Sequence, residues 1–308
     1  MYDLIILGGG PAAAAGAIYA ARKQLKTLLI TGEWGGQSSV STEIFNWIGT
    51  PSISGLDLAT ALEKHVRAYE GEMLAVKSGE WAKQVAKNAD GNFTVATDKD
   101  SYIGKTILIA TGSSRKKLDV PGAAEYENKG ITYCASCDGP VFSGQDVAVI
   151  GGGNAGFESA AQLLAYCKSV TLIIRGENFR ADEITVNALL KNPKLTVIKN
   201  ADILRVEGTQ FVDKLAYKDK TSGEEKMLPV GGIFVEIGQI PNTGLVDGVA
   251  KLDEFKKIIV DPMTQMTTQD GVWAAGDCTN GLYHQNNIAS GDAVKALENL
   301  YQWVQKRK

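Results

Sequence analysis

The residues best suited to chemistry in this sequence are two cysteines and an acid, in the segment Cys134-Ala135-Ser136-Cys137-Asp138. Two cysteines separated by two residues can close a small disulfide ring or open to a dithiol, and near a βαβ pattern this spacing is typical of a redox pair. Neighbouring groups can favour the thiolate, which is the form that attacks a disulfide. Asp138 follows the second cysteine and could pass protons to or from the sulfurs. The segment therefore predicts thiol–disulfide chemistry.

The alternative for the same pair is half of a structural zinc site. Such a site takes four ligands, and the other candidates are Cys167, Cys278, His65 and His284, which form no second pair of similar spacing. We interpret Cys167 as a packing residue, because free cysteines are commonly buried. His65 lies near the apolar face of an expected helix and is interpreted as a surface or packing residue. The redox interpretation is favoured.

The elements that must hold this chemistry begin with a βαβ unit at the amino terminus. A nearly continuous apolar run predicts a buried strand over residues 2–7, followed by an alanine-rich helix and a second strand over 27–31. The turn between strand and helix is Gly8-Gly9-Gly10-Pro11-Ala12-Ala13, whose spacing lets the backbone approach a pyrophosphate at a helix N-terminus. No acid ends the second strand, where Thr31-Gly32 stands and Glu33 is displaced.

A second βαβ unit follows the cysteines. It comprises a strand over 147–150, the turn Gly151-Gly152-Gly153-Asn154-Ala155-Gly156, a helix over about 155–166 and a strand over 170–174. The composition restarts near residue 115, which predicts a domain boundary there. Two dinucleotide folds in one chain amount to an internal duplication of architecture.

The remaining patterns predict two further helices, two antiparallel meanders and several short strands. We expect helices at 56–70 and 290–304, meanders at 73–103 and 195–240, and strands at 106–112, 257–260 and 271–275. The chain is therefore expected to be an α/β protein of two Rossmann-like dinucleotide-binding domains.

Composition limits the classes of function. With 308 residues the chain can bury two cores of ordinary size, and a net charge of -3 gives no basic field for nucleic acid or for membrane lipid. Residues 4–21 are apolar, but three glycines and a proline interrupt them and no Lys or Arg precedes them, which disfavours a signal sequence. Four cysteines in a chain of this length favour a reducing compartment, so a cytoplasmic location is expected.

Seven motifs in this order make the sequence resemble the low-molecular-weight thioredoxin reductases. It resembles as closely the flavoprotein part of the reductase that serves alkyl hydroperoxide peroxidases. The motifs cover essentially the whole chain and are Gly8–Ala13, Gly35-Gly36-Gln37, Ala110-Thr111-Gly112, Cys134-x-x-Cys137-Asp138, Gly151–Gly156, Gly238-x-x-Pro241-Asn242-Thr243 and Gly276-Asp277. The additional amino-terminal thioredoxin-like domain of the peroxide-linked relative is expected to be absent, so a separate small thiol protein would carry electrons onward.

The resemblance implies a fold of the pyridine nucleotide-disulfide oxidoreductase type, with three layers that include a parallel sheet and a β-meander. It implies an FAD-binding domain at 1–115 and 244–308, and an NAD(P)H-binding domain at 116–243 that carries the cysteines. It also implies a homodimer whose nucleotide domain rotates, so that nicotinamide and dithiol meet the flavin alternately.

The resemblance further assigns roles to individual residues. Cys137 would face the flavin, Cys134 would attack the partner's disulfide, and Asp138 would act as acid and base. Asp277 would bind the ribityl chain of FAD, and His284 stands where relatives usually carry Arg or Lys. The residues implied to bind FAD are Gly8, Gly10, Pro11, Ala13, Gly36, Gln37, Asn46, Ala110, Thr111, Gly112, Gly276, Asp277 and Gln285.

The same comparison places the nicotinamide nucleotide in the second glycine turn. The residues implied to bind it are Gly151, Gly153, Asn154 and Gly156, with Arg175 and Arg180 for a 2′-phosphate. The glutamate that suits NADH in the peroxide-linked relative is absent at the strand end, as are a histidine and a second arginine of the NADPH-using relatives. NADPH is therefore expected over NADH, by a modest margin.

Three functions compete on this evidence. The first is an NAD(P)H-dependent reductase for thioredoxin or a thioredoxin-like protein, with an NADH-linked peroxiredoxin reductase as its near variant. The second is a flavin dithiol oxidase that passes electrons to oxygen, which needs no nicotinamide and so leaves the second glycine turn unexplained. The third is a regulatory ligand sensor, which leaves the cysteine pair and its acid unexplained.

Overall fold

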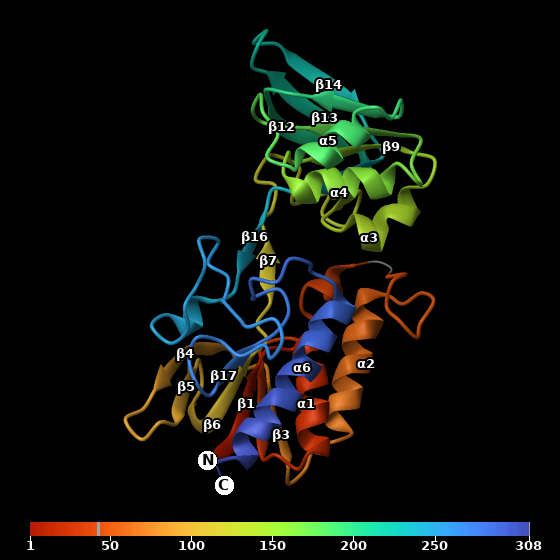
Figure 1. Ribbon diagram of the computed structural model, residues 1–308. Helices are drawn as coiled ribbons and strands as arrows, with labels where there is room; N and C mark the ends of the chain where they lie inside the picture. The colour runs from red at the N-terminus through yellow and green to blue at the C-terminus, as the bar shows by residue number, and fades with distance from the viewer. Residues whose placement is uncertain (42–43, 308) are drawn as a thin grey trace.

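The computed structural model describes residues 1–41 and 44–307, which form two domains joined by a pair of strands (Figure 1). The first domain is built on a seven-stranded sheet of order β3-β2-β1-β6-β5-β4, with β17 paired to β6. Its strands are β1 (Tyr2–Leu7), β2 (Thr27–Thr31), β3 (Leu74–Ser78), β4 (Ala82–Lys87), β5 (Phe93–Thr97), β6 (Ser101–Ile109) and β17 (Val272–Ala274). Strand β6 is long enough to pair antiparallel with β5 at its start and parallel with β1 and β17 at its end.

Three helices cover one face of this sheet, α1 (Pro11–Arg22), α2 (Gly55–Arg67) and α6 (Asn286–Gln305) (Figure 1). The alanines of α1 are buried and small, so α6 packs closely on it through Leu297 and Leu300. The opposite face packs against Val85, Val95 and the segment that contains η3 (Gly244–Val246). The sheet is therefore buried on both faces, which explains the continuous apolar runs of its central strands.

The second domain repeats this plan with a five-stranded parallel sheet of order β11-β10-β9-β15-β8. Helices α4 and α5 cover one face, and an antiparallel meander of β12, β13 and β14 covers the other. The bounds are β8 (Ile131–Thr132), β9 (Asp146–Ile150), α4 (Asn154–Leu163), β10 (Ser169–Ile173), α5 (Glu183–Leu189), β11 (Leu195–Ile198), β12 (Ala201–Gly208), β13 (Val212–Asp219), β14 (Glu225–Pro229) and β15 (Gly232–Val235).

The two domains are connected by β7 (Ser113–Arg115) and β16 (Gln239–Pro241), which pair antiparallel (Figure 1). Asn242 fastens this ribbon to the first domain, because its side chain donates to the Thr111 carbonyl at 3.0 Å and its backbone N–H donates to the Gly112 carbonyl at 3.0 Å. The Thr111 hydroxyl in turn donates to the carbonyl of Asn242 at 2.7 Å. These bonds give a structural reason for Asn242 in the motif that follows Gly238.

The α/β fold with two Rossmann-like domains is confirmed, and several local expectations were wrong. Strand β3 was expected in a meander but runs parallel to β2, and β11 and β15 likewise belong to the parallel sheet of their domain. The expected strand at Lys257–Val260 forms only isolated bridges, because its neighbours are loops rather than a sheet edge. Helix α6 begins at Asn286 rather than at Ser290. The exact domain limits remain a prediction.

Candidate functional site

A cavity of about 700 Å³ lies between the first domain and the cysteine segment of the second. Its volume falls within the range of pockets that hold cofactors, roughly 300–1,000 Å³. Both glycine-containing turns of the first domain line it, together with the ends of β2 and β6. Cys134, Cys137 and Asp138 line it from the other side, so the predicted redox group and the predicted FAD site share one space.

The first glycine turn has the geometry that a pyrophosphate requires. Gly8 has φ +133°, and a Cβ there would lie 2.2 Å from the carbonyl oxygen of Ala110, so only glycine fits. Gly10 is open, since its nearest neighbour is the Cα of Gly36 at 4.0 Å. Helix α1 starts directly after it with Pro11, with no side-chain cap and no acid in its first turn. Its first backbone N–H groups are therefore left to bind an anion.

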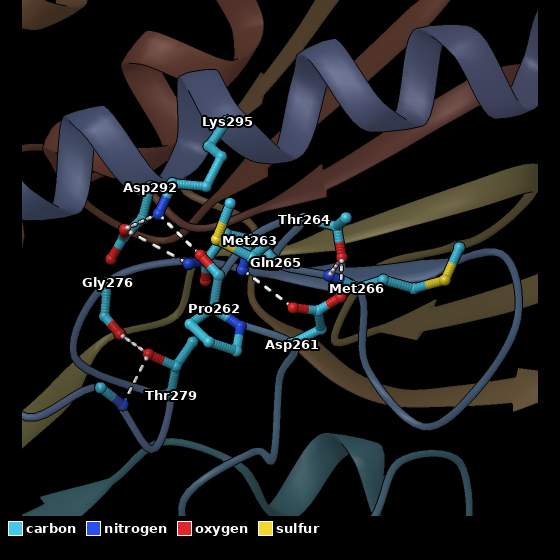
Figure 2. Close-up of polar contacts among 11 residues, drawn as sticks. Asp261, Pro262, Met263, Thr264, Gln265, Met266, Gly276, Thr279, Asp292 and Lys295 are labelled. Atoms are coloured by element: carbon cyan, nitrogen blue, oxygen red, sulfur yellow. Dashed lines mark hydrogen bonds and ion pairs between the residues drawn. The ribbon is translucent and has the colours of Figure 1, made fainter.

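The turn at Gly276 and Asp277 brings a carboxylate to the cavity. Gly276 has φ +76°, and the hydroxyl of Thr279 donates to its carbonyl at 2.8 Å, which closes the turn (Figure 2). The loop at 261–266 is held on α6 beside it, because Lys295 donates to the Pro262 carbonyl at 2.8 Å (Figure 2). The Asp277 side chain is 25% exposed and lines the cavity. Asp277 thus presents its carboxylate from a rigid turn.

The remaining residues assigned to FAD divide into those that line the cavity and those behind it. Asn46 is exposed and reaches the cavity through Gln285, since its side-chain amide donates to Gln285 Oε1 at 2.9 Å. Ala13 is fully buried behind the turn, where it packs in the core. The residues of the set that line the cavity are Gly8, Gly10, Pro11, Gly36, Gln37, Ala110, Thr111, Gly112, Gly276, Asp277 and Gln285.

Two residues of the lining were missed by the sequence analysis, Glu80 and Trp81 in the loop between β3 and β4. The Trp81 ring lies against Gly32, where a Cβ would come within 2.0 Å of it, and so it walls the cavity at the end of β2. An aromatic ring there can stack on a planar base. No local motif marks Trp81, since its place depends on the hairpin that returns beside β2.

The cysteine pair is a disulfide at the start of the short helix α3 (Ala135–Asp138), with 5.3 Å between the Cα atoms of Cys134 and Cys137. The backbone N–H of Cys137 donates to Cys134 Sγ at 3.2 Å. After reduction the same N–H can stabilise a thiolate on Cys134. The ring can therefore open to a dithiol whose outer sulfur is already provided with a hydrogen-bond donor.

Asp138 is a buried acid beside this disulfide, with 8% of its surface exposed. Burial raises the pKa of its carboxyl group, and the hydrogen bond donated by Thr132 to Oδ2 offsets part of that rise. Its Oδ1 is buried without a hydrogen-bond partner. A carboxyl group that favours the protonated form and has a free oxygen can hold and release a proton for the neighbouring sulfurs.

The zinc alternative fails because Cys134 and Cys137 are bonded to each other. Cys167 packs in the core on the helix side of the second domain, and Cys278 packs in the core of the first. Burial raises the pKa of each of these thiols to about 11, so both stay protonated and inert at neutral pH. The interpretation of Cys167 as a packing residue is confirmed.

The second glycine turn has the same design as the first but lies outside the cavity lining. Gly151 has φ +140° and its Cβ would lie 2.1 Å from the carbonyl oxygen of Glu236, whereas Gly153 has open space around it. A Cβ at Gly156 would lie 2.1 Å from the Gly151 carbonyl oxygen, so glycine allows the helix to pack closely on the turn. A tight turn, an open approach and close helix packing are the three roles of glycine in a dinucleotide site. Asn154 braces the turn by accepting the Asp182 N–H at 2.9 Å.

The two predicted arginines lie at this turn but differ in their surroundings. Arg180 is attached to it, because its backbone N–H donates to the Gly152 carbonyl at 2.8 Å. Arg175 has an 87% exposed side chain whose Nε lies 3.2 Å from Asp202 Oδ1, and Lys220 lies 3.1 Å from the same oxygen. Asp202 therefore partly neutralises the arginine that was expected to bind a 2′-phosphate.

Comparison with known proteins agrees with this geometry. A family model described as pyridine nucleotide-disulphide oxidoreductase matches residues 2–293. The chain belongs to this family. Its members generally use FAD and a nicotinamide nucleotide, and the two glycine turns fit those two ligands.

Several relatives resemble the chain over nearly all of its length. It is 41% identical to the F protein of alkyl hydroperoxide reductase from Pseudomonas aeruginosa, over 96% of this chain and 57% of that protein. It is 36% identical to a NADH dehydrogenase of Bacillus subtilis, over 98% of this chain and 58% of that protein. The chain thus spans less than three fifths of these two relatives.

Solved thioredoxin reductases share the whole fold. The enzyme of Streptococcus pyogenes is 31% identical, with a TM-score of 0.88 and coverage of 99% of both chains. The Lactococcus lactis enzyme, solved in an FR conformation, is 32% identical, with a TM-score of 0.70 and coverage of 99% of this chain and 100% of that one. The protein is therefore a flavoprotein oxidoreductase of the thioredoxin reductase type, with a disulfide-forming cysteine pair. Within the described residues, no helix is long and apolar enough to cross a membrane.

Proposed function

We propose that this protein is an FAD-dependent disulfide reductase that passes electrons from NADPH, through FAD and the Cys134–Cys137 pair, to thioredoxin or a thioredoxin-like protein. The observation that carries the proposal is that the disulfide and a buried acid line the same cavity as the first glycine turn. FAD, when bound, supplies the transfer of two electrons between a nicotinamide and a disulfide. The residues of the chain supply binding, orientation and protons.

The cysteine pair then performs ordinary thiol–disulfide exchange. Reduction of the disulfide takes up two electrons and two protons and gives the thiols of Cys134 and Cys137. The Cys134 thiolate attacks one sulfur of the partner's disulfide, forms a mixed disulfide and expels the partner's other sulfur as a thiolate. Cys137 attacks Cys134 Sγ, which restores the intramolecular disulfide and releases the partner's second thiolate. Asp138 can hold the proton that these steps exchange, because its pKa is raised by burial.

The nicotinamide nucleotide needs a second arrangement of the domains. The turn at Gly151–Gly156 lies outside the lining of the cavity, whereas the cysteines face it. A nicotinamide and the disulfide would therefore contact the flavin in turn. A TM-score of 0.70 for the Lactococcus lactis enzyme, against 0.88 for that of Streptococcus pyogenes at similar identity, is what a different domain orientation would give. We infer that the second domain rotates about the ribbon of β7 and β16.

The proposed partner and setting follow from the thiol chemistry. A reduced dithiol is stable where thiol pools are kept reduced, so the proposed location is the cytoplasm. The solved relatives named above are thioredoxin reductases, which supports a thioredoxin-like acceptor. A homodimer is proposed on the same likeness.

The test is anaerobic reduction of the FAD-loaded protein by NADPH, followed by reduction of thioredoxin measured by thiol titration. Wild-type protein should lose its flavin absorbance and then reduce the partner. Cys134→Ser and Cys137→Ser should keep flavin reduction and lose partner reduction, because exchange needs both sulfurs. Loss of flavin reduction in both variants, or partner reduction in either, would contradict the proposal.

A second candidate is an NADH-linked reductase for a peroxidase system. Two observations favour it: 41% identity to a protein of alkyl hydroperoxide reductase, and the Asp202 carboxylate that partly neutralises Arg175. The same assay distinguishes the candidates when NADH replaces NADPH and a peroxiredoxin with its thiol carrier replaces thioredoxin. Oxygen consumption with a small dithiol and no nucleotide would instead indicate a dithiol oxidase.

A further inference from the structure

A lysine, a histidine and an aspartate form a short polar chain at the edge of the cavity. Lys257 Nζ lies 2.8 Å from His284 Nε2, and His284 Nδ1 lies 3.5 Å from Asp277 Oδ1. His284 and Asp277 line the cavity, with 17% and 25% of their side chains exposed, and Lys257 lies behind them in a half-buried position. The chain of contacts thus runs from the protein into the cavity.

The backbone fixes all three positions. The Ile258 N–H donates to the Cys278 carbonyl at 2.8 Å, which places Lys257 beside the segment that carries Asp277. Lys257 itself closes a tight loop, because its backbone N–H donates to Asp253 Oδ1 at 2.9 Å and its carbonyl accepts the Asp253 N–H at 2.8 Å. The convergence is therefore built into the fold and does not depend on one long flexible side chain.

The hydrogen-bonding capacities of these groups select one form of the histidine. A lysine ammonium has donors and no acceptor, so Nε2 of His284 must accept from Lys257 and carries no proton. A carboxylate only accepts, so Asp277 is attracted to a proton on Nδ1 and repelled by a lone pair there. Both partners are satisfied only by a neutral ring with its proton on Nδ1.

We propose that Lys257 is a positioning residue that fixes His284 in the Nδ1–H tautomer and thereby aims the Asp277 carboxylate at the hydroxyl groups of a bound polyol chain, that of FAD. This inference rests on the proposed function for the identity of the ligand. The Nδ1–H attracts Oδ1, which leaves Oδ2 of Asp277 to accept from the ligand. Lys257 also keeps a positive charge near this end of the cavity without occupying it.

The tautomer can be measured directly, because the sequence holds two histidines, His65 and His284. Long-range ¹H–¹⁵N correlation spectra of protein labelled at histidine report which ring nitrogen carries the proton, and His65→Gln assigns the two rings. We expect His284 in the Nδ1–H form in wild-type protein, with and without FAD. Lys257→Met should release the ring to a mixture of forms, and Lys257→Arg should keep the Nδ1–H form because arginine also donates.

The second readout is the affinity of the apoprotein for FAD, followed by quenching of FAD fluorescence. Lys257→Met should bind FAD roughly threefold to tenfold more weakly, because one charge-assisted contact no longer orders the carboxylate. Lys251→Met is the matched control, since it changes an exposed lysine of the same loop, and it should change neither the spectrum nor the affinity.

Two results would overturn the proposal. The first is a His284 ring protonated on Nε2 in the wild type, or a ring unchanged in Lys257→Met. The second is FAD affinity in Lys257→Met within twofold of the wild type although the tautomer has changed. Failure of the wild type to bind FAD would refute the proposed function instead, and the spectra would still decide whether Lys257 controls the ring.

Discussion

Replacement of Asp138 by asparagine tests the proton-holding role with little change of shape. The wild-type carboxyl is 8% exposed, its pKa is raised by burial, and Oδ1 has no hydrogen-bond partner. Asparagine has the same outline, keeps an acceptor for the Thr132 hydroxyl and cannot release a proton. We expect exchange between the reduced cysteine pair and a protein disulfide to slow by about 10²-fold to 10⁴-fold, the usual contribution of a positioned acid or base.

The same variant should change the pH dependence of stability in a defined direction. Because the folded pKa of Asp138 is raised, its stabilising contribution is fully present below the unfolded pKa and is lost as pH rises through the folded pKa. The variant has no such loss. Its free energy of unfolding minus that of the wild type should therefore increase with pH in this window, with a slope that approaches about 1.4 kcal/mol per pH unit, and stay constant above it.

The assay is urea unfolding of the apoprotein between pH 3 and 8, with stopped-flow exchange measured on the same samples. Asp146→Asn is the control of opposite sign. Hydrogen bonds from Lys168 and Ser169 lower the pKa of the exposed Asp146, so its contribution is lost as pH falls. Parallel stability curves for Asp138→Asn and wild type, or equal exchange rates, would refute the reasoning on Asp138.

Three further predictions concern the second domain. Gly153→Ala should fold normally and bind nicotinamide nucleotide at least tenfold more weakly in a titration, because its Cβ enters open space, whereas Gly156→Ala should lower the unfolding midpoint, because its Cβ would lie 2.1 Å from a carbonyl oxygen. Arg115→Met should destabilise the protein by about 2–3 kcal/mol at pH 8 in urea unfolding, since it leaves the buried Glu236 carboxylate unpaired, and by less at pH 5, where that carboxylate takes up a proton more readily. Asp202→Asn should raise the ratio of kcat/KM for NADPH to that for NADH by about fivefold, and an unchanged ratio would show that its ion pair does not govern nucleotide choice.

The parts of the site that depend on local backbone geometry could be predicted from the sequence. Gly8 and Gly151 occupy positive-φ positions where a Cβ would strike a carbonyl oxygen, so their motif reports the turn directly. The cysteine spacing likewise predicted the disulfide, because two intervening residues bring the Cα atoms to 5.3 Å. These signals lie within a few residues of the chemistry they encode.

The parts that depend on tertiary convergence could not be predicted. Trp81 and Lys257 reach the cavity region from loops far from any motif, and Thr132 becomes a partner of Asp138 only through the short strand β8. Strand β3 was assigned to a meander because its second half is exposed, which gives it the alternating polarity of an antiparallel strand although its partner β2 is parallel.

The connections between the domains show where a change of orientation would require the least distortion. Asn242 ties one end of the ribbon of β7 and β16 to the first domain, and the ion pair of Arg115 with the buried Glu236 ties the other end to the second. Beside these anchors lie Gly112 and Gly238, both at positive φ, +62° and +115°, and at each of them a Cβ would have no atom within 4 Å. Since glycine crosses between backbone regions without a steric penalty, rotation of the second domain would be concentrated at these two residues. The Arg115–Glu236 pair would then travel with the nucleotide site, and the cysteines would leave the cavity together with Asp138, so that the disulfide and its acid stay one unit in both orientations.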